Sequence, residues 1–141
     1  MRINIVRNVD AGEILKRTKS LKRKKNLNDD EVLTLEKYTQ AIRAYEESGE
    51  VYFDEELVTE LTLEKFRKVF TKKRLEILNQ LDKISFSSIA ELSRHVKRDI
   101  KNIYDDLKIL EKFDLVKLNK NGKTTSPMLN VESINIEFFS R

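Results

Sequence analysis

The sequence contains no cysteine, no tryptophan, one proline and three glycines among its 141 residues. Without cysteine, the chain can form neither a disulfide bond nor a thiolate metal site. No apolar run approaches the length of a membrane span or a signal peptide, so we expect a cytoplasmic chain with no membrane partner. The single histidine, His95, and the scattered glycines make neither a zinc site nor a phosphate-binding loop. We therefore expect no enzymatic activity, no metal and no cofactor.

The chain is rich in charged residues, which make up 37% of the sequence, and its net charge is +4. The charge is segregated: residues 1–28 carry +7, residues 29–70 carry −7, residues 71–125 carry +5 and residues 126–141 carry −1. Basic blocks favour nucleic acid as a partner, and the acidic block favours a basic protein or the chain's own basic segment. Residues 16–25 hold seven bases and no acid, which predicts a flexible solvated arm or a segment paired with an anionic partner.

The first 60 residues contain signals for a strand and a helix. The alternating "RINIV" predicts a short strand, and Asn28 followed by Glu31 predicts a capped helix start. Gly49 predicts the end of that helix, and "EVYFD" at residues 50–54 predicts a short extended piece. The helix has an apolar stripe that needs a partner surface, either a second chain or the chain's own C-terminal half. We predict that it is a dimerisation surface, made by Leu35, Tyr38, Ile42 and Tyr45.

The second half predicts helices followed by strands, which makes the chain α+β. Ser87 is expected to cap a short helix, and Asp99 a longer one. The inward seam of the longer helix is predicted to consist of Ile100, Ile103, Leu107 and Leu110. Asn121-Gly122 predicts a two-residue hairpin turn, and "SINIEFF" predicts a last strand.

This order of elements is typical of a winged helix-turn-helix domain, whose second helix enters a major groove of DNA. Arginine suits guanine edges and asparagine suits adenine, whereas lysines on the hairpin suit phosphates. A merely solvated charged face and a coiled-coil strand are the alternatives, although the seam is too short for the latter. The residues predicted to bind DNA are Ser87, Ser88, Lys97, Arg98, Lys101, Asn102, Asp105, Lys117, Lys120, Lys123, Thr124 and Thr125.

The segments "TKKRLEILNQL", "SIAELSRHVKRDIKNIYDDLKILEKFDLV" and "SPMLNVESINIEF" resemble the MarR-like winged helix-turn-helix regulators of archaea and some bacteria. The resemblance covers roughly residues 40–140. It implies DNA binding as a dimer, and some such proteins look like antitoxins encoded beside a small toxin. The matched recognition positions are Arg98, Asp99, Lys101 and Asn102. The sequence departs from the family pattern at Lys72, Lys97 and Asp114, where Pro, Gly and Gly are often found.

The sequence thus predicts an α+β chain with an N-terminal strand and helix extension over residues 1–60 and a winged helix-turn-helix domain over residues 61–141. We expect a homodimeric, sequence-specific regulator of transcription that binds double-stranded DNA and acts as a repressor. The alternative is an antitoxin that neutralises a cognate toxin protein by binding it and represses its own operon.

Overall fold

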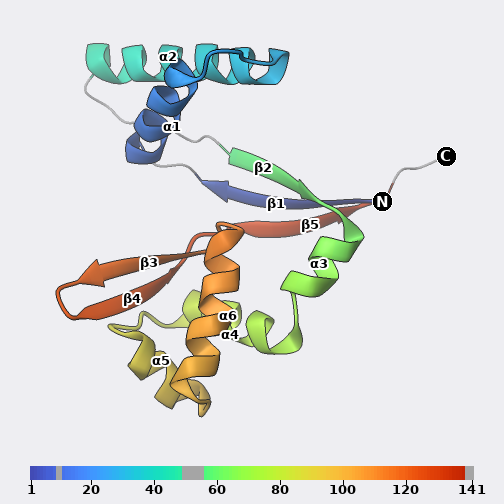
Figure 1. Cartoon of the computed structure of the whole chain (residues 1–141), viewed down its shortest axis with the longest axis vertical. Helices are drawn as coiled ribbons and strands as arrows, with labels where there is room; N and C mark the ends of the chain where they lie inside the picture. Colours follow the sequence, from blue (N-terminus) through green and yellow to red (C-terminus); the bar gives the residue numbers. More distant parts are fainter. Residues whose placement is uncertain (9–10, 49–55, 139–141) are drawn as a thin grey trace. The chain divides into compact units, whose positions relative to one another are not determined.

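A computed structural model describes residues 1–8, 11–48 and 56–138 of the protein (Figure 1). It is a mixed α+β structure with two small antiparallel sheets, and six helices are assigned in these residues. The chain divides into a larger unit, residues 1–7 with 58–141, and a smaller unit, residues 8–57. Gly49 and the segment 50–54, predicted to end a helix and to be extended, lie outside the described residues. None of the described helices is both long and apolar enough to cross a membrane.

The larger unit contains a three-stranded sheet built from distant parts of the chain. Its strands are β1 (Arg2–Asn8), β2 (Glu56–Leu61) and β5 (Ser133–Glu137), in the order β2-β1-β5. The predicted first and last strands are confirmed and pair with each other, with Ile3 opposite Ile136 and Ile5 opposite Ile134. The division predicted at residue 60 therefore separates two strands that belong to one sheet, because β1 hydrogen-bonds to β5 and lies in the larger unit.

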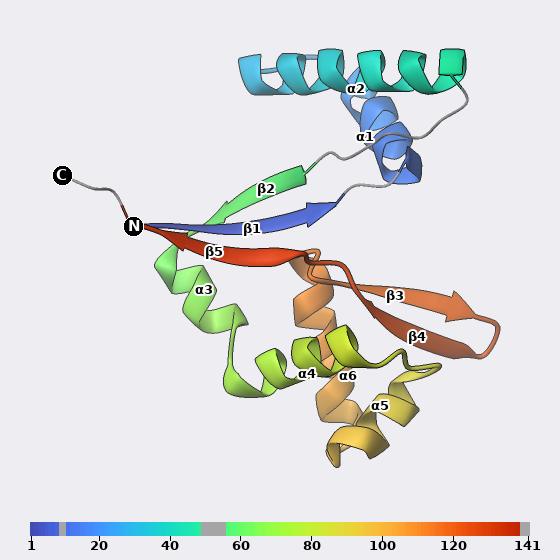
Figure 2. The ribbon, with the colours of Figure 1, turned by 180° about the vertical axis from the view of Figure 1, so that it is seen from behind.

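Four helices and a hairpin complete the larger unit (Figures 1 and 2). The helices are α3 (Leu63–Val69), α4 (Lys72–Lys83), α5 (Ile89–Val96) and α6 (Ile100–Lys112). The hairpin joins β3 (Val116–Asn121) to β4 (Thr124–Leu129). Threonine and serine side chains cap α3, α4 and α5 by accepting a backbone N–H three residues later.

The hairpin is confirmed, but its turn lies one residue later than predicted. Asn121 pairs with Thr124, so the two loop residues are Gly122 and Lys123 rather than Asn121 and Gly122. Gly122 has φ +66°, which the first central position of a type I′ or II′ turn requires. Pro127 is tolerated because β4 pairs with β3 alone in a two-stranded sheet.

The core of the larger unit lies where α4, α5 and α6 meet the strands. Three of the four predicted seam residues of α6 are fully buried, but Ile100, the first residue of the helix, is 49% exposed. The fully buried core side chains include Ile3, Ile77, Leu92, Ile103, Leu107, Leu110, Leu115 and Val116.

The smaller unit pairs α1 (Ala11–Arg23) with α2 (Asp29–Ser48). The basic segment, predicted to be either a flexible arm or paired with an anionic partner, is helical up to Arg23, because its apolar positions pack against a partner helix. Ile14 and Tyr38 are buried against each other, with Leu21 and Ile42 beside them. The predicted start of α2 is confirmed: Asn28 Oδ1 accepts the Glu31 N–H, and the Glu31 carboxylate accepts the Asn28 N–H.

Candidate nucleic-acid interface

The turn between α5 and α6 is set by one residue with a left-handed backbone. Lys97 has φ +56° and ψ +47°, and the Arg98 N–H donates to the Ser93 carbonyl in a Schellman-type helix end. Asp99 occupies the N-cap position of α6 as predicted, but its side chain makes no capping hydrogen bond. The turn between the two helices is therefore only three residues long, because α5 ends at Val96 and α6 begins at Ile100.

The first turns of α6 present a polar face to solvent. Lys101, Asn102 and Asp105, all predicted to contact DNA, are exposed, while Ile103 and Leu107 anchor the other side of the helix in the core. Tyr104, which sequence reasoning did not single out, is 45% exposed on the same helix. Its position one residue after a buried isoleucine could have indicated this. The face therefore offers amide, carboxylate, ammonium and aromatic groups on a rigid support.

Arg98 does not belong to this free face. Its Nη2 donates to Asp106 Oδ2 at 2.7 Å, and Asp106 Oδ1 accepts from Arg74 Nε at 3.1 Å. The side chains of all three residues are between 15% and 18% exposed. Arg98 is thus held in an ion triad between α4 and α6, whereas its predicted contact with a base stays a prediction. Sequence reasoning missed this because Arg74 lies 32 positions from Asp106.

The same triad changes the electrostatics expected of α6. An unpaired Asp106 carboxylate would repel phosphate, but two guanidinium groups compensate its charge. Asp105 remains the exposed carboxylate of the first turns. Arg98 Nη1 is buried and has no hydrogen-bond acceptor among the described residues, a cost of about 1–3 kcal/mol that the ion pair must offset.

The start of α5 is already occupied by a carboxylate. The N-cap is Ser88 rather than the predicted Ser87, since Ser88 Oγ accepts the Glu91 N–H at 3.0 Å. Glu91 Oε2 in turn accepts from the Ser87 hydroxyl at 2.5 Å and from the Ser87 N–H at 2.8 Å. These hydrogen bonds hold the pKa of Glu91 below its ordinary value. A phosphate at this helix end would face a negative charge, which weakens the prediction for Ser87 and Ser88.

The hairpin places two of its three predicted lysines in solvent. Lys120 and Lys123 are exposed near the tip, whereas Lys117 is half-buried. Thr124 is exposed and its hydroxyl donates to the Asn121 carbonyl at 3.1 Å, and Thr125 is half-buried. The tip is therefore a basic projection, with Lys123 in its two-residue turn and Lys120 in the adjoining strand.

An open depression of about 520 Å³ lies between the start of α4 and the start of α6. Two exposed lysines on its α4 side, Lys72 and Lys73, were not predicted to bind anything. The run "TKKR" at residues 71–74 could have indicated a binding role for these lysines. However, a run of three basic residues is not distinctive in a chain that is rich in basic residues. The depression is lined by Thr71, Lys72, Lys73, Arg74, Arg98, Asn102, Asp105 and Asp106.

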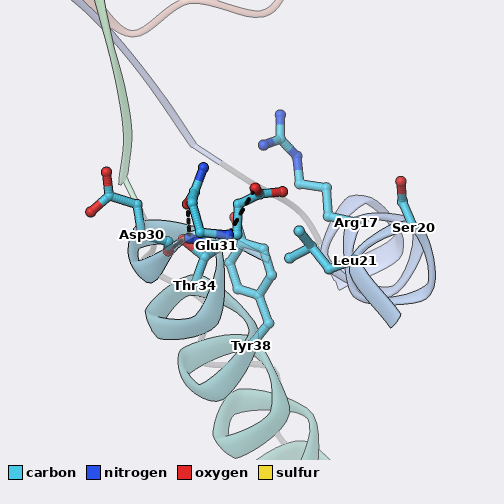
Figure 3. A pocket seen from close by; sticks show the side chains of 8 residues that line it. Arg17, Ser20, Leu21, Asp30, Glu31, Thr34 and Tyr38 are labelled. Atoms are coloured by element: carbon cyan, nitrogen blue, oxygen red, sulfur yellow. Dashed lines mark hydrogen bonds between the residues drawn. The ribbon is translucent and has the colours of Figure 1, made fainter. Parts of the chain in front are cut away.

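The predicted dimerisation stripe on α2 is used in part within the chain. Tyr38 is 2% exposed and Ile42 packs beside it against α1, whereas Leu35 is half-buried and Tyr45 is 42% exposed. Figure 3 shows Tyr38 of α2 facing Leu21 of α1 at a pocket of about 290 Å³. The Tyr38 hydroxyl is buried and has no hydrogen-bond partner in the part of the chain that the structure describes.

The basic segment is partly neutralised in the same unit. Lys24 Nζ contacts both carboxylate oxygens of Glu31, at 2.8 and 2.7 Å, and this ammonium group is the main cause that holds the pKa of Glu31 below its ordinary value. Besides Lys24 itself, the exposed bases of the segment are Lys16, Lys19, Lys22, Arg23 and Lys25.

His95 has a structural environment at the end of α5. Its Nε2 lies 3.1 Å from Gln80 Oε1, and its ring meets Phe86 edge-on with centroids 5.3 Å apart. Both contacts hold α5 against the end of α4 and the loop that follows it.

Comparison with known proteins finds a similarity in the C-terminal half of the chain. The HVO_A0114 family model matches residues 69–136, which run from the end of α3 into β5. No curated protein matches the chain significantly. The matched region holds the triad, the exposed face of α6 and the basic hairpin.

Proposed function

We propose that this chain is a sequence-specific, double-stranded-DNA-binding regulator of transcription of the winged helix-turn-helix class, acting as a homodimeric repressor. The observation that carries the proposal is the exposed start of α6, where Lys101, Asn102 and Asp105 stand on a helix whose opposite side is fully buried. A short preceding helix and a basic hairpin on the same unit fit the way such domains meet a major groove and its flanking phosphates.

Roles can be assigned to the side chains of this face. Asn102 can form two hydrogen bonds to an adenine edge, and Asp105 can accept from the N4 amino group of cytosine. Lys101, Lys120 and Lys123 suit phosphates, which orient the protein but carry no sequence information. Arg98 supports the face by tying α6 to α4.

A homodimer would place two such helices in successive major grooves, about 34 Å apart. In the smaller unit, Tyr45 and the exposed Leu33 remain apolar and outward-facing after α1 has covered Tyr38. The dimer contact is therefore proposed to use these two residues rather than the centre of the stripe.

Replacing Asn102 by Ala tests the recognition face. Binding to a selected cognate duplex should weaken by about 1–3 kcal/mol, and one base position should lose its preference, because a bidentate contact is removed. Fluorescence anisotropy against single-base variants of the site measures both effects. Lys120→Gln should instead weaken all duplexes alike. If Asn102→Ala binds every duplex as the wild type does, the recognition face has been assigned wrongly.

The antitoxin remains as a second candidate function, favoured by the apolar side chains that the smaller unit exposes. Leu15, Val32 and Leu33 are between 40% and 64% exposed, which suits a protein partner. Coexpression with the product of an adjacent small gene, followed by gel filtration, would test it. A 1:1 complex that is lost on Val32→Asp, a residue outside the proposed dimer contact, supports the antitoxin, whereas separate elution of the two proteins contradicts it.

A further inference from the structure

We infer that Lys72 and Lys73, the α4 lysine pair, bind the phosphodiester backbone of duplex DNA beside the groove that α6 enters, an inference that rests on the proposed function. Both lysines are exposed, and neither forms an ion pair or a hydrogen bond within the described parts of the chain. Their charge is therefore available to an external anion.

The position of the α4 lysine pair relates it directly to the recognition face. Both lysines line the depression that Asn102 and Asp105 line from α6. A DNA segment that brings a base edge to Asn102 therefore brings its own backbone close to the start of α4, because a lysine side chain spans several ångströms and the major groove is only about 12 Å wide.

The start of α4, which carries the α4 lysine pair, and the basic hairpin lie on opposite sides of α6. Figures 1 and 2 show the start of α4, next to α3, on one side of α6 and the β3–β4 hairpin on the other. A helix in the major groove has a phosphate backbone on each side of it. Lys120 and Lys123 can thus meet one backbone and the α4 lysine pair the other, which would fix the angle of α6 in the groove.

The charge balance of the depression favours an anion. Asp106 is compensated by Arg74 and Arg98, so Asp105 is the one lining carboxylate without an ion pair in the described residues. The same depression is lined by Lys72 and Lys73, whose side chains have no ion-pair partner in the described residues. Because the depression is open and lysine makes few geometric demands, a continuous row of phosphates fits it better than a small carboxylate ligand.

The test is the salt dependence of binding by Lys72→Gln/Lys73→Gln. Each lost phosphate contact should reduce the slope of log affinity against log salt by about 0.9, so the double variant should be shallower by about 1.8 on cognate and random-sequence duplexes alike. Base preference at the cognate site should not change. Glutamine keeps the helix propensity of lysine, and circular dichroism should show an unchanged fold.

Lys83→Gln/Lys112→Gln is the matched control. These exposed lysines are the last residues of α4 and α6, and their replacement removes the same amount of charge. The slope of this control should stay close to that of the wild type. Equal slopes for the two double variants would overturn the inference while leaving the proposed function intact. A relaxed base preference in Lys72→Gln/Lys73→Gln would also overturn it, because backbone contacts carry no sequence information. If the wild-type chain binds no duplex, the proposed function and this inference fall together.

Discussion

Single residues in this protein take their roles from partners that lie far away in the sequence. Arg98 has the position of a base-reading residue, yet Asp106 and Arg74 hold it within the protein. Lys72 and Lys73 follow a capping threonine and would pass for ordinary helix-surface residues, yet they share a depression with Asn102. The chemistry of a side chain is intrinsic to it, but whether that chemistry is free to act depends on its neighbours.

The Glu91 side chain is predicted to make the free energy of unfolding depend on pH. Its folded-state pKa is lowered by hydrogen bonds from Ser87, so the stability that the carboxylate contributes is present above the ordinary value of 4.5 and is lost as the pH falls through the lowered pKa. The free energy of unfolding of Glu91→Gln should therefore depend less steeply on pH below 4.5 than that of the wild type.

Urea unfolding at a series of acidic pH values measures this difference. Glu76→Gln is a suitable control, because Glu76 is exposed on α4 and forms no ion pair within the described residues. Parallel pH profiles for wild type and Glu91→Gln would rule out the proposed role of Glu91.

At the scale of helices and strands, the ends of elements decide the arrangement. Two helices end in left-handed residues, Lys97 after α5 and Asp114 after α6, with φ +56° and +58°. In each case a backbone N–H one residue later donates to a carbonyl five residues before it. The same sharp reversal thus orients α6 after α5 and β3 after α6.

Substitution of these two residues by glycine should have different effects on stability. Lys97→Gly should stabilise the larger unit by about 0.5–1 kcal/mol. Glycine relieves the backbone strain of about 1–2 kcal/mol that a left-handed conformation imposes on lysine. Part of this gain is lost because glycine raises the conformational entropy of the unfolded chain. Asp114→Gly should not stabilise it. Aspartate tolerates the conformation better, and its carboxylate lies 3.8 Å from Arg7 Nη2.

Thermal unfolding of the two variants under identical conditions makes the comparison. A lower melting temperature for Lys97→Gly than for the wild type would show that the lysine side chain contributes more at this turn than its backbone strain costs.

For the whole molecule, the pairing of β1 with β5 links the two ends of the described chain. Ile3 and Ile136 are directly opposite in register, yet Ile3 is 2% exposed and belongs to the core, while Ile136 is 48% exposed. The N-terminal strand is therefore part of the larger unit. Removing the first 50 residues to test for dimerisation would also remove a central strand, so point substitutions such as Tyr45→Ala are the better test.

The pair Ile3 and Ile136 provides a matched test of this link. Ile3→Ala should cost about 2–5 kcal/mol of unfolding free energy, as expected for a large-to-small change in a core. Ile136→Ala should cost less than about 1 kcal/mol, because half of that side chain is already in solvent. Urea unfolding followed by circular dichroism measures both, and equal costs would contradict the burial of β1 in the core.

The sequence by itself determined what short-range patterns can specify. Spacings of three and four residues located α6 and its seam at Ile103, Leu107 and Leu110, and Asn28 with Glu31 located the start of α2. Alternation located β1 and β5, and the single Gly122 located the hairpin to within one residue. These signals succeed because helices, caps and turns are decided by interactions between residues close in sequence.

Only the tertiary structure decided which charges are free and which segments have partners. The basic residues 16–23 form a helix because Ile14 and Leu21 find Tyr38 and Ile42 on α2, a contact that no local pattern contains. Arg98 is held because Arg74 and Asp106 converge on one place from different helices. Lys72 and Lys73 lie beside Asn102 for the same reason. Ion pairing and exposure depend on distances between side chains, and for residues far apart in the chain the fold alone sets those distances.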